Sequence, residues 1–296
     1  MITDKCTSKC RHCSNTQILG ASHVISPNKS KEILSILTNS FKIESVMAFG
    51  GEPLLYPEVT TDILSHAKKL NIERRQIITN CYWSKKYDRI DEISHMLKKA
   101  DVNDILISVD CFHQEHLDFK IIDYTISQLC NMELPSIKLH PCWYISKDSN
   151  NKYDSDTRSY LKKLSKYNLE VTEGNILFPA GNAVKNFPDR FEPIQNISEI
   201  VCGKAPYTER PDHITSIGIN PDGKVSSSCF GDYMEVEEFI RNYNPYKDKL
   251  MHTLLTSGFK GIHDIAKQKG IDFDIKNYYS VCDACSDLRK RIEDKL

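Results

Sequence analysis

Short β-branched runs alternate with amphipathic stretches from the start of the chain to about Ala183. A short apolar run fits a buried strand, and a longer stretch with apolar residues every three or four positions fits a helix packed on a sheet. Six such strand–helix units predict a parallel sheet with helices around it. The expected strands are residues 1–3, 44–49, 75–79, 105–110, 137–144 and 175–178, and the expected helices are residues 26–41, 57–70, 89–100, 116–132 and 156–167.

The pattern changes after Pro188. Two runs, residues 213–219 and 224–228, flank the sequence Asn-Pro-Asp-Gly, which is typical of a tight turn between antiparallel strands. Helical patterns follow over about residues 235–270 and at the charged end of the chain. The sequence therefore predicts an α/β protein in two parts. A partial (β/α)6 TIM-like barrel is expected over residues 1–188, and a small annex of a β-hairpin and helices over residues 189–296.

Composition and charge narrow the function classes. The 296 residues carry 39 Lys and Arg against 40 Asp and Glu, a net charge of -1, which does not indicate a binder of nucleic acids or anionic membranes. The apolar stretches are too short to span a bilayer, and the start of the chain lacks the apolar segment of a signal peptide. We therefore expect a cytoplasmic protein whose 11 cysteines serve metal or redox chemistry rather than disulfides.

Three cysteines, Cys6, Cys10 and Cys13, lie close together on a loop after the first expected strand. Thiolates at this spacing can bind one soft metal centre, and a cysteine-rich loop without a pair of histidine ligands favours iron–sulfur over zinc. Three protein ligands on a 4Fe-4S cluster leave one iron open. A zinc site completed by a distant residue is the alternative that the residues themselves leave open.

The spacing Cys-x3-Cys-x2-Cys, with His12 in the position of an aromatic ring before the third cysteine, resembles the radical S-adenosylmethionine (SAM) superfamily. The resemblance implies a 4Fe-4S cluster on Cys6, Cys10 and Cys13 whose open iron binds SAM. It also implies that an electron from a flavodoxin-type or ferredoxin-type donor cleaves SAM to a 5'-deoxyadenosyl radical, which takes a hydrogen atom from a substrate.

A second motif, Phe49-Gly50-Gly51-Glu52-Pro53, follows the next expected strand. It fits an ordinary turn, but two glycines also allow backbone groups to approach a ligand closely, and a carboxylate suits an ammonium group. In its place after the cysteine loop it resembles the family's site for the amino group of SAM. Later strand ends match more loosely, since Cys81 stands where the family has glycine in a Thr-Asn-Gly element. The resemblance assigns cofactor binding to His12, Gly50, Gly51, Glu52, Thr79, Asn80, Ser108 and Asp110, with the loop Gly181-Asn182-Ala183 under the adenine.

Four further cysteines, Cys202, Cys229, Cys282 and Cys285, lie before the expected hairpin, after it and near the end of the chain. They can converge into a four-thiolate site, which by ligand type alone suits zinc as well as iron–sulfur. Their order around the hairpin resembles the "twitch" cluster domain, a shortened relative of the SPASM domain. That resemblance implies a second, auxiliary 4Fe-4S cluster that accepts or donates electrons.

The expected substrate follows from a finer resemblance. The Gly-Gly-Glu loop, the segment 110–113, the hairpin and the final Cys-x2-Cys are similar to small peptide-modifying enzymes of the epipeptide epimerase type. Those enzymes have two adjacent cysteines after the hairpin, where this chain has Ser228 and Cys229. We therefore expect modification of a ribosomally made peptide, by epimerisation or cross-linking, with Cys111 and Cys229 as the catalytic candidates for returning a hydrogen atom.

Three alternatives bear on this expectation. A dehydrogenase would use the same radical to oxidise a small alcohol or aminocyclitol. Cyclisation of a nucleotide is another outcome among the relatives, and we set it aside because those cyclases typically end in Gly-Gly whereas this chain ends in Lys295-Leu296. A zinc-stabilised binding protein, from a different class, would use both cysteine sets structurally.

Overall fold

The computed structural model describes residues 1–14, 23–204, 208–226 and 234–295. The chain divides into two compact units. The first comprises Met1–Asn186 and Asn220–Gly223, and the second comprises Phe187–Ile219 and Lys224–Leu296. The first long segment ends at Asn186, and the assignment of the two parts to a radical SAM barrel and a cluster-binding annex stays a prediction.

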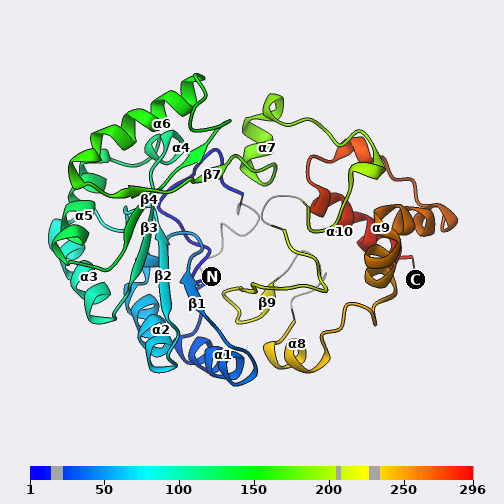
Figure 1. The fold of residues 1–296 in the computed structure, drawn as a ribbon, viewed down its shortest axis with the longest axis horizontal. Helices are drawn as coiled ribbons and strands as arrows, with labels where there is room; N and C mark the ends of the chain where they lie inside the picture. Colours follow the sequence, from blue (N-terminus) through cyan, green and yellow to red (C-terminus); the bar gives the residue numbers. More distant parts are fainter. Residues whose placement is uncertain (15–22, 205–207, 227–233, 296) are drawn as a thin grey trace. The chain divides into compact units, whose positions relative to one another are not determined.

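A parallel five-stranded sheet forms the centre of the first unit, in the order β1-β2-β3-β4-β6 (Figure 1). Ile77 of β2 pairs in register with Ala48 of β1 and Ile105 of β3, and all three side chains are buried. Two further strands, β5 and β7, form a separate parallel pair. The expected α/β fold with a mostly parallel sheet is confirmed, and it is consistent with a partial TIM-like barrel. The strands are β1 Ser45–Ala48, β2 Arg74–Thr79, β3 Asp104–Ser108, β4 Ile137–His140, β5 Cys142–Trp143, β6 Glu170–Val171 and β7 Asn175–Ile176.

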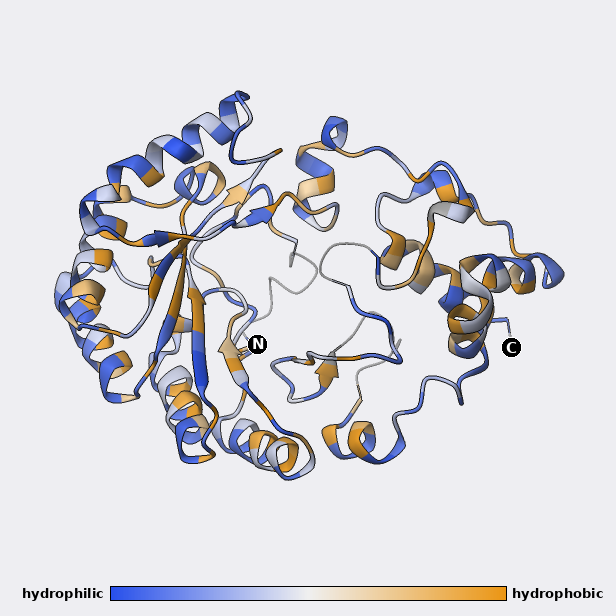
Figure 2. Ribbon diagram, viewed as in Figure 1, coloured by the Kyte–Doolittle hydropathy of each residue, from blue (hydrophilic) through white to orange (hydrophobic). Residues whose placement is uncertain are grey.

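Helices α1, α2, α3 and α5 lie along the outside of this sheet, and the hydropathy colouring shows apolar residues on the sides turned toward it (Figures 1 and 2). In α1 the buried residues Ile33, Leu34 and Leu37 recur at helical spacing, and Pro27 occupies the first turn, where a missing N–H costs nothing. The helices of this unit are α1 Pro27–Ser40, α2 Pro57–Lys69, α3 Tyr87–Lys99, α4 Cys111–Gln114, α5 Phe119–Asn131, α6 Lys152–Lys163 and α7 Asn182–Asn186, with 3-10 turns η1 Pro53–Leu55 and η2 Ser165–Tyr167.

The second unit contains the two strands of the expected hairpin and an apolar helical core. Strands β8 and β9 are antiparallel, as the turn sequence predicts. Leu254, Phe259 and Ile262 of α9 are buried with Leu288 and Ile292 of α10. The elements are β8 Gly218–Ile219, β9 Val225–Ser226, α8 Val236–Asn242, α9 Lys249–Gln268 and α10 Val281–Glu293, with 3-10 turns η3 Pro188–Arg190, η4 Ile197–Glu199 and η5 Ile275–Asn277. No helix in the described part of the chain combines the length and apolar character that a membrane span requires.

Several local expectations differ from the structure, and three of them have a clear local form. The strand expected over residues 137–144 is divided into β4 and β5 at Pro141, which has no N–H for a strand ladder. The helix expected from residue 116 begins at Phe119, because Asp118 caps it by accepting from the Lys120 N–H at 3.0 Å. The first expected strand is reduced to single bridges at Thr3, and the two-residue strand β6 was not expected.

Candidate active site

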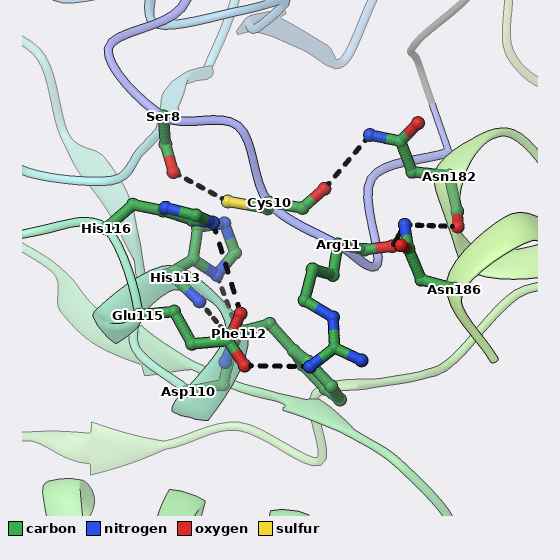
Figure 3. Close-up of polar contacts among 10 residues, drawn as sticks. All are labelled: Ser8, Cys10, Arg11, Asp110, Phe112, His113, Glu115, His116, Asn182 and Asn186. Atoms are coloured by element: carbon green, nitrogen blue, oxygen red, sulfur yellow. Dashed lines mark hydrogen bonds and ion pairs between the residues drawn. The ribbon is translucent and has the colours of Figure 1, made fainter.

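The three-cysteine loop lies at the C-terminal edge of the sheet, with Cys10 buried and Cys6 and Cys13 half-buried, and all three thiols are free of disulfides. Polar groups are directed at two of the sulfurs. The Ser8 N–H donates to Cys6 Sγ at 3.5 Å, and Asn80 Nδ2 donates to the same sulfur at 3.7 Å. Figure 3 shows the contact of Ser8 with Cys10, in which Ser8 Oγ is 2.9 Å from Cys10 Sγ. Hydrogen bonds of this kind stabilise thiolates, the form in which cysteine binds metal.

Burial keeps the Cys6 and Cys10 thiols protonated when no metal is bound. Burial raises the pKa of Cys6 to about 11, against the lowering effect of the Ser8 N–H, and it raises the pKa of Cys10 still further above the usual range. A coordinating metal replaces the proton and supplies the positive charge that a buried thiolate lacks. Three cysteines outside any disulfide, two of them with hydrogen-bonding groups beside their sulfurs, are therefore a donor set that fits an iron–sulfur cluster.

The glycines after β1 allow the cysteine loop to pack directly against the end of that strand. Gly51 N–H donates to the Thr3 carbonyl and Glu52 N–H to the Lys5 carbonyl, both at 2.8 Å. A Cβ atom on Gly51 would lie 2.0 Å from the Lys5 oxygen, and one on Gly50, whose φ is +143°, would lie 2.3 Å from the Thr3 oxygen. The sequence predicts a close approach at these glycines, and the structure shows that the neighbour is the backbone of the cysteine loop.

Glu52 ties the ends of β1 and β2 together. Its buried carboxylate accepts from the Leu54 N–H at 3.0 Å, the Thr79 hydroxyl at 2.8 Å and the Asn80 N–H at 2.9 Å. Burial raises the pKa of Glu52 to about 7, although these donors favour the ionised form. Glu52 therefore holds Thr79 and Asn80 in place, and its role as a ligand for SAM stays a prediction.

Asn80 and Cys81 continue this contact toward the cysteine loop. Asn80 Nδ2 donates to Thr7 Oγ1 at 3.1 Å, so the side chain reaches the loop between two predicted cluster ligands. Cys81 is buried in the left-handed region with φ +58°, a conformation that favours glycine. This backbone requirement explains why a glycine is found here in the Thr-Asn-Gly element that the sequence resembles.

Asp110 and His113 form a carboxylate–imidazole pair after β3. Asp110 Oδ1 accepts from the Phe112 and His113 N–H groups at 3.1 and 2.9 Å, which caps α4, and Oδ2 lies 2.8 Å from His113 Nδ1. Burial opposes ionisation of Asp110, but the His113 charge and hydrogen bonds hold its pKa below the usual range. Burial also lowers the pKa of His113, and Asp110 outweighs that effect and raises it. Ser108, the last residue of β3, is half-buried.

His12 joins this pair from the cysteine loop. Its ring stacks on Phe112 at 4.8 Å between centroids and meets His113 edge-on at 4.7 Å, and burial lowers the pKa of His12 to about 4. The ligand atoms of Cys10, His12 and His113 lie within 4.8 Å of one another. The sequence predicts His12 as part of the site. For His113 it predicts either a polar group beside the substrate or the start of a helix. The structure places His113 at the cysteine loop itself.

Two asparagines of α7 make three contacts with the cysteine loop that local sequence patterns do not predict. Asn182 N–H donates to the Cys13 carbonyl at 2.9 Å, and its side-chain amide donates to the Cys10 carbonyl at 3.3 Å. Asn186 Nδ2 donates to the Arg11 carbonyl at 3.1 Å (Figure 3). The sequence predicts the Gly181-Asn182-Ala183 loop to lie under the adenine of SAM. The only signal for the contact with the cysteine loop is that an asparagine follows a glycine at this loop.

The predicted hydrogen donors and auxiliary ligands are placed as follows. Cys111 is buried at the start of α4, its N–H donates to Thr157 Oγ1 at 3.1 Å, and burial raises the pKa of its thiol to about 12. In the second unit, Cys202 and Cys285 pack against the same apolar core, and Cys282 lies one turn before Cys285 in α10. Cys229 lies outside the described residues, so the four-thiolate site stays a prediction.

Comparison with known proteins bears directly on this site. Residues 1–131 match the model of the radical SAM superfamily. The chain therefore contains a radical SAM domain, and the cysteine loop, the Gly-Gly-Glu turn and the Asp110–His113 pair all lie within it. This domain implies a 4Fe-4S cluster and SAM as cofactors.

Two curated relatives are both described as GTP 3',8-cyclase, from Listeria monocytogenes serovar 1/2a (strain ATCC BAA-679 / EGD-e) and from Listeria monocytogenes serotype 4b (strain CLIP80459). Each is 25% identical over 240 residues, which cover 77% of this chain and 67% of the relative. They belong to the nucleotide-cyclising class, which the C-terminal residues Lys295-Leu296 do not favour, and their similarity keeps a nucleotide as a candidate substrate.

Proposed function

We propose that this radical SAM enzyme removes a hydrogen atom from a ribosomally made peptide and thereby epimerises one residue or cross-links two. One observation carries the proposal: the cysteine loop, the Gly-Gly-Glu turn and the Asp110–His113 pair lie against one another at the C-terminal edge of the sheet. The supporting contacts are the Glu52 N–H bond to Lys5, the Asn80 amide bond to Cys6 and the packing of His12 on His113. Active sites of β/α folds lie at this edge.

The residues present fit the cofactors that the domain implies. Cys6, Cys10 and Cys13 would hold a 4Fe-4S cluster, and Glu52 lies beside them with the glycines that the family uses for the amino group of SAM. When bound, the cluster and SAM supply a radical that abstracts hydrogen from an unactivated carbon. The buried side chains of Cys10, Asp110 and Phe112 exclude water from the site.

Cys111 suits the return of a hydrogen atom in an epimerisation. Because burial raises the pKa of Cys111 to about 12, the thiol keeps its hydrogen at neutral pH. In this step the S–H bond of the cysteine breaks while a C–H bond forms on the opposite face of the substrate carbon. The thiyl radical that remains is returned to the thiol by one proton and by one electron from the flavodoxin-type or ferredoxin-type donor. Cys229 could take this step only in place of a role as an iron ligand, because a thiolate bound to a cluster has no hydrogen atom to donate. Without such a donor, loss of a further electron to a second cluster leads to cross-linking.

The proposed auxiliary cluster would be held by Cys202, Cys229, Cys282 and Cys285. Support comes from the second unit, where one apolar core packs against both Cys202 and Cys285, and from the helical spacing of Cys282 and Cys285. Such a cluster gives the substrate radical an electron acceptor. The same acceptor would serve a dehydrogenase acting on a small alcohol or aminocyclitol.

A nucleotide is the second candidate substrate, and the observation that favours it is the similarity to two GTP 3',8-cyclases. At 25% identity the relatives support the shared radical chemistry more firmly than a shared substrate. The two proposals differ in the substrate that the enzyme consumes. Parallel reactions with a peptide and with GTP therefore distinguish them.

The test is anaerobic reconstitution with iron, sulfide and a reductant, followed by reaction with SAM in heavy water. One arm contains a precursor peptide encoded beside the gene, one contains GTP and one contains a small alcohol. Uptake of one deuterium at a Cα atom supports epimerisation, and loss of two hydrogen atoms from the peptide supports cross-linking. Turnover of GTP or alcohol alone would overturn the peptide proposal. Colourless protein that contains zinc and no iron would support the zinc-stabilised binding protein instead.

A further inference from the structure

Ser8 lies between two of the predicted cluster ligands and contacts both. Its backbone N–H donates to Cys6 Sγ at 3.5 Å, and its hydroxyl oxygen is 2.9 Å from Cys10 Sγ (Figure 3). Ser8 is 6% exposed and Cys10 is 7% exposed, so the contact between hydroxyl and sulfur is shielded from water. A polar contact in such a place is stronger than the same contact at the surface.

The direction of this bond follows from the chemistry of a bound thiolate. In the free protein either the hydroxyl or the thiol can be the donor. A thiolate bound to metal has no proton, so the Ser8 hydroxyl must donate to Cys10 Sγ. A donor beside a ligand sulfur stabilises the more negative charge state, which for a cluster is the reduced state.

We propose that Ser8 is a positioning residue whose hydroxyl, by donating to the Cys10 thiolate, raises the reduction potential of the cluster at the cysteine loop. The inference rests on the proposed cluster at Cys6, Cys10 and Cys13. It assigns separate roles to the two polar groups of one residue. The backbone N–H supports Cys6 whatever the side chain, and the hydroxyl acts on Cys10 alone.

The Ser8→Ala variant isolates the hydroxyl, because alanine keeps the N–H that faces Cys6. The potential is measured by anaerobic redox titration of the reconstituted full chain, monitored by electron paramagnetic resonance. The signal to follow is the one that changes on addition of SAM, which separates this cluster from a proposed auxiliary one. We expect unchanged iron content and a roughly tenfold less favourable equilibrium for reduction of the cluster. For a one-electron couple this corresponds to a reduction potential about 59 mV lower.

Two further variants control for a purely structural effect. Ser14→Ala removes a hydroxyl from an exposed position of the same loop and should leave the potential unchanged. Ser8→Thr keeps a hydroxyl and should restore most of the wild-type potential. A structural role alone would change thermal stability and iron content in Ser8→Ala without moving the potential of the cluster that does assemble.

The outcomes are distinguishable. Ser8→Ala protein with full iron content and the wild-type potential would overturn the role of Ser8 and leave the proposed function intact. Wild-type protein with no cluster that responds to SAM would overturn both. If Ser8→Ala fails to assemble a cluster, Ser8→Thr and Ser8→Val decide, because threonine and valine have the same shape and only threonine has a hydroxyl. Ser8→Val should give the lower potential, and equal potentials would contradict the inference.

Discussion

A Cβ atom on Gly51 would lie 2.0 Å from the carbonyl oxygen of Lys5, the residue before the first cysteine of the loop. The same closeness lets the Glu52 N–H donate to that carbonyl at 2.8 Å. The turn after β1 and the cysteine loop are thus packed backbone against backbone. A change in the shape of either one is transmitted to the other.

Gly51→Ala should destabilise the protein and reduce cluster assembly. The added methyl group meets the backbone of Lys5 and Cys6, which cannot turn aside as a side chain can. We expect a loss of about 2 kcal/mol or more in the free energy of unfolding, measured by denaturant titration, with lower iron content after reconstitution. Gly270→Ala is the control, since nothing lies within 4 Å of its Cβ position and only its φ of +65° costs energy, about 1 kcal/mol. Equal effects of the two changes would argue against the packing described here.

Asp110→Ala should cost more stability than Asp118→Ala, although both residues cap helices. Asp118 accepts from the Lys120 N–H at 3.0 Å near the surface. Asp110 is buried, pairs with His113 and also accepts from the Cys142 N–H at 3.1 Å. We expect losses in unfolding free energy of about 1 kcal/mol for Asp118→Ala and about 3 kcal/mol or more for Asp110→Ala. Comparable losses would mean that Asp110 serves only as a cap.

Glu52 predicts a dependence of stability on pH. Burial raises its pKa from 4.5 to about 7 in the folded protein. The contribution of protonated Glu52 to the free energy of unfolding is therefore complete below about pH 4.5. It is lost as pH rises through about 7, because Glu52 in the unfolded chain releases its proton at a lower pH. Over that interval the wild type should lose about 3 kcal/mol relative to Glu52→Gln, which does not titrate. The comparison is made by denaturant unfolding of reduced, cluster-free protein, and parallel pH profiles for the two proteins would refute it.

Cys282→Ser should remove the proposed auxiliary cluster while the SAM-binding cluster remains. A chain with two 4Fe-4S clusters binds about eight iron atoms, and the variant should bind about four. SAM should still be cleaved, since Cys6, Cys10 and Cys13 are untouched. Cys130→Ser, a change in the helix α5, is the control and should keep the full iron content. A variant that retains all its iron would rule out Cys282 as a ligand.

Much of the sheet could be predicted because its strands are short apolar runs between amphipathic helices. The pattern placed the strand containing Ile77 and the one containing Ile105 within one or two residues of their observed ends. It failed at Pro141, where one ring without an N–H divides the expected strand over residues 137–144 into two. It also failed to expect β6, since two residues show no periodicity.

In the candidate site too, some residues can be predicted from short motifs and others only from the structure. Cys6, Cys10, Cys13 and Glu52 stand in short motifs, so their proximity follows from spacing and from the parallel order of the strands. The contacts of Asn182 with the cysteine loop join residues far apart in sequence, and no local pattern predicts them. The sequence does not predict the contact of His113 with the cysteine loop, because a histidine two residues into a helix has no distinctive spacing. The structure shows His113 between Asp110 and His12.

The central claim is that the three-cysteine loop holds the cluster that cleaves SAM. The most direct measurement is the formation of 5'-deoxyadenosine from SAM under strictly anaerobic, reducing conditions, with wild type, Cys10→Ala and the control Cys130→Ala compared at equal protein concentration. The account predicts product from the wild type and from Cys130→Ala, and none above background from Cys10→Ala. Undiminished product from Cys10→Ala would contradict it.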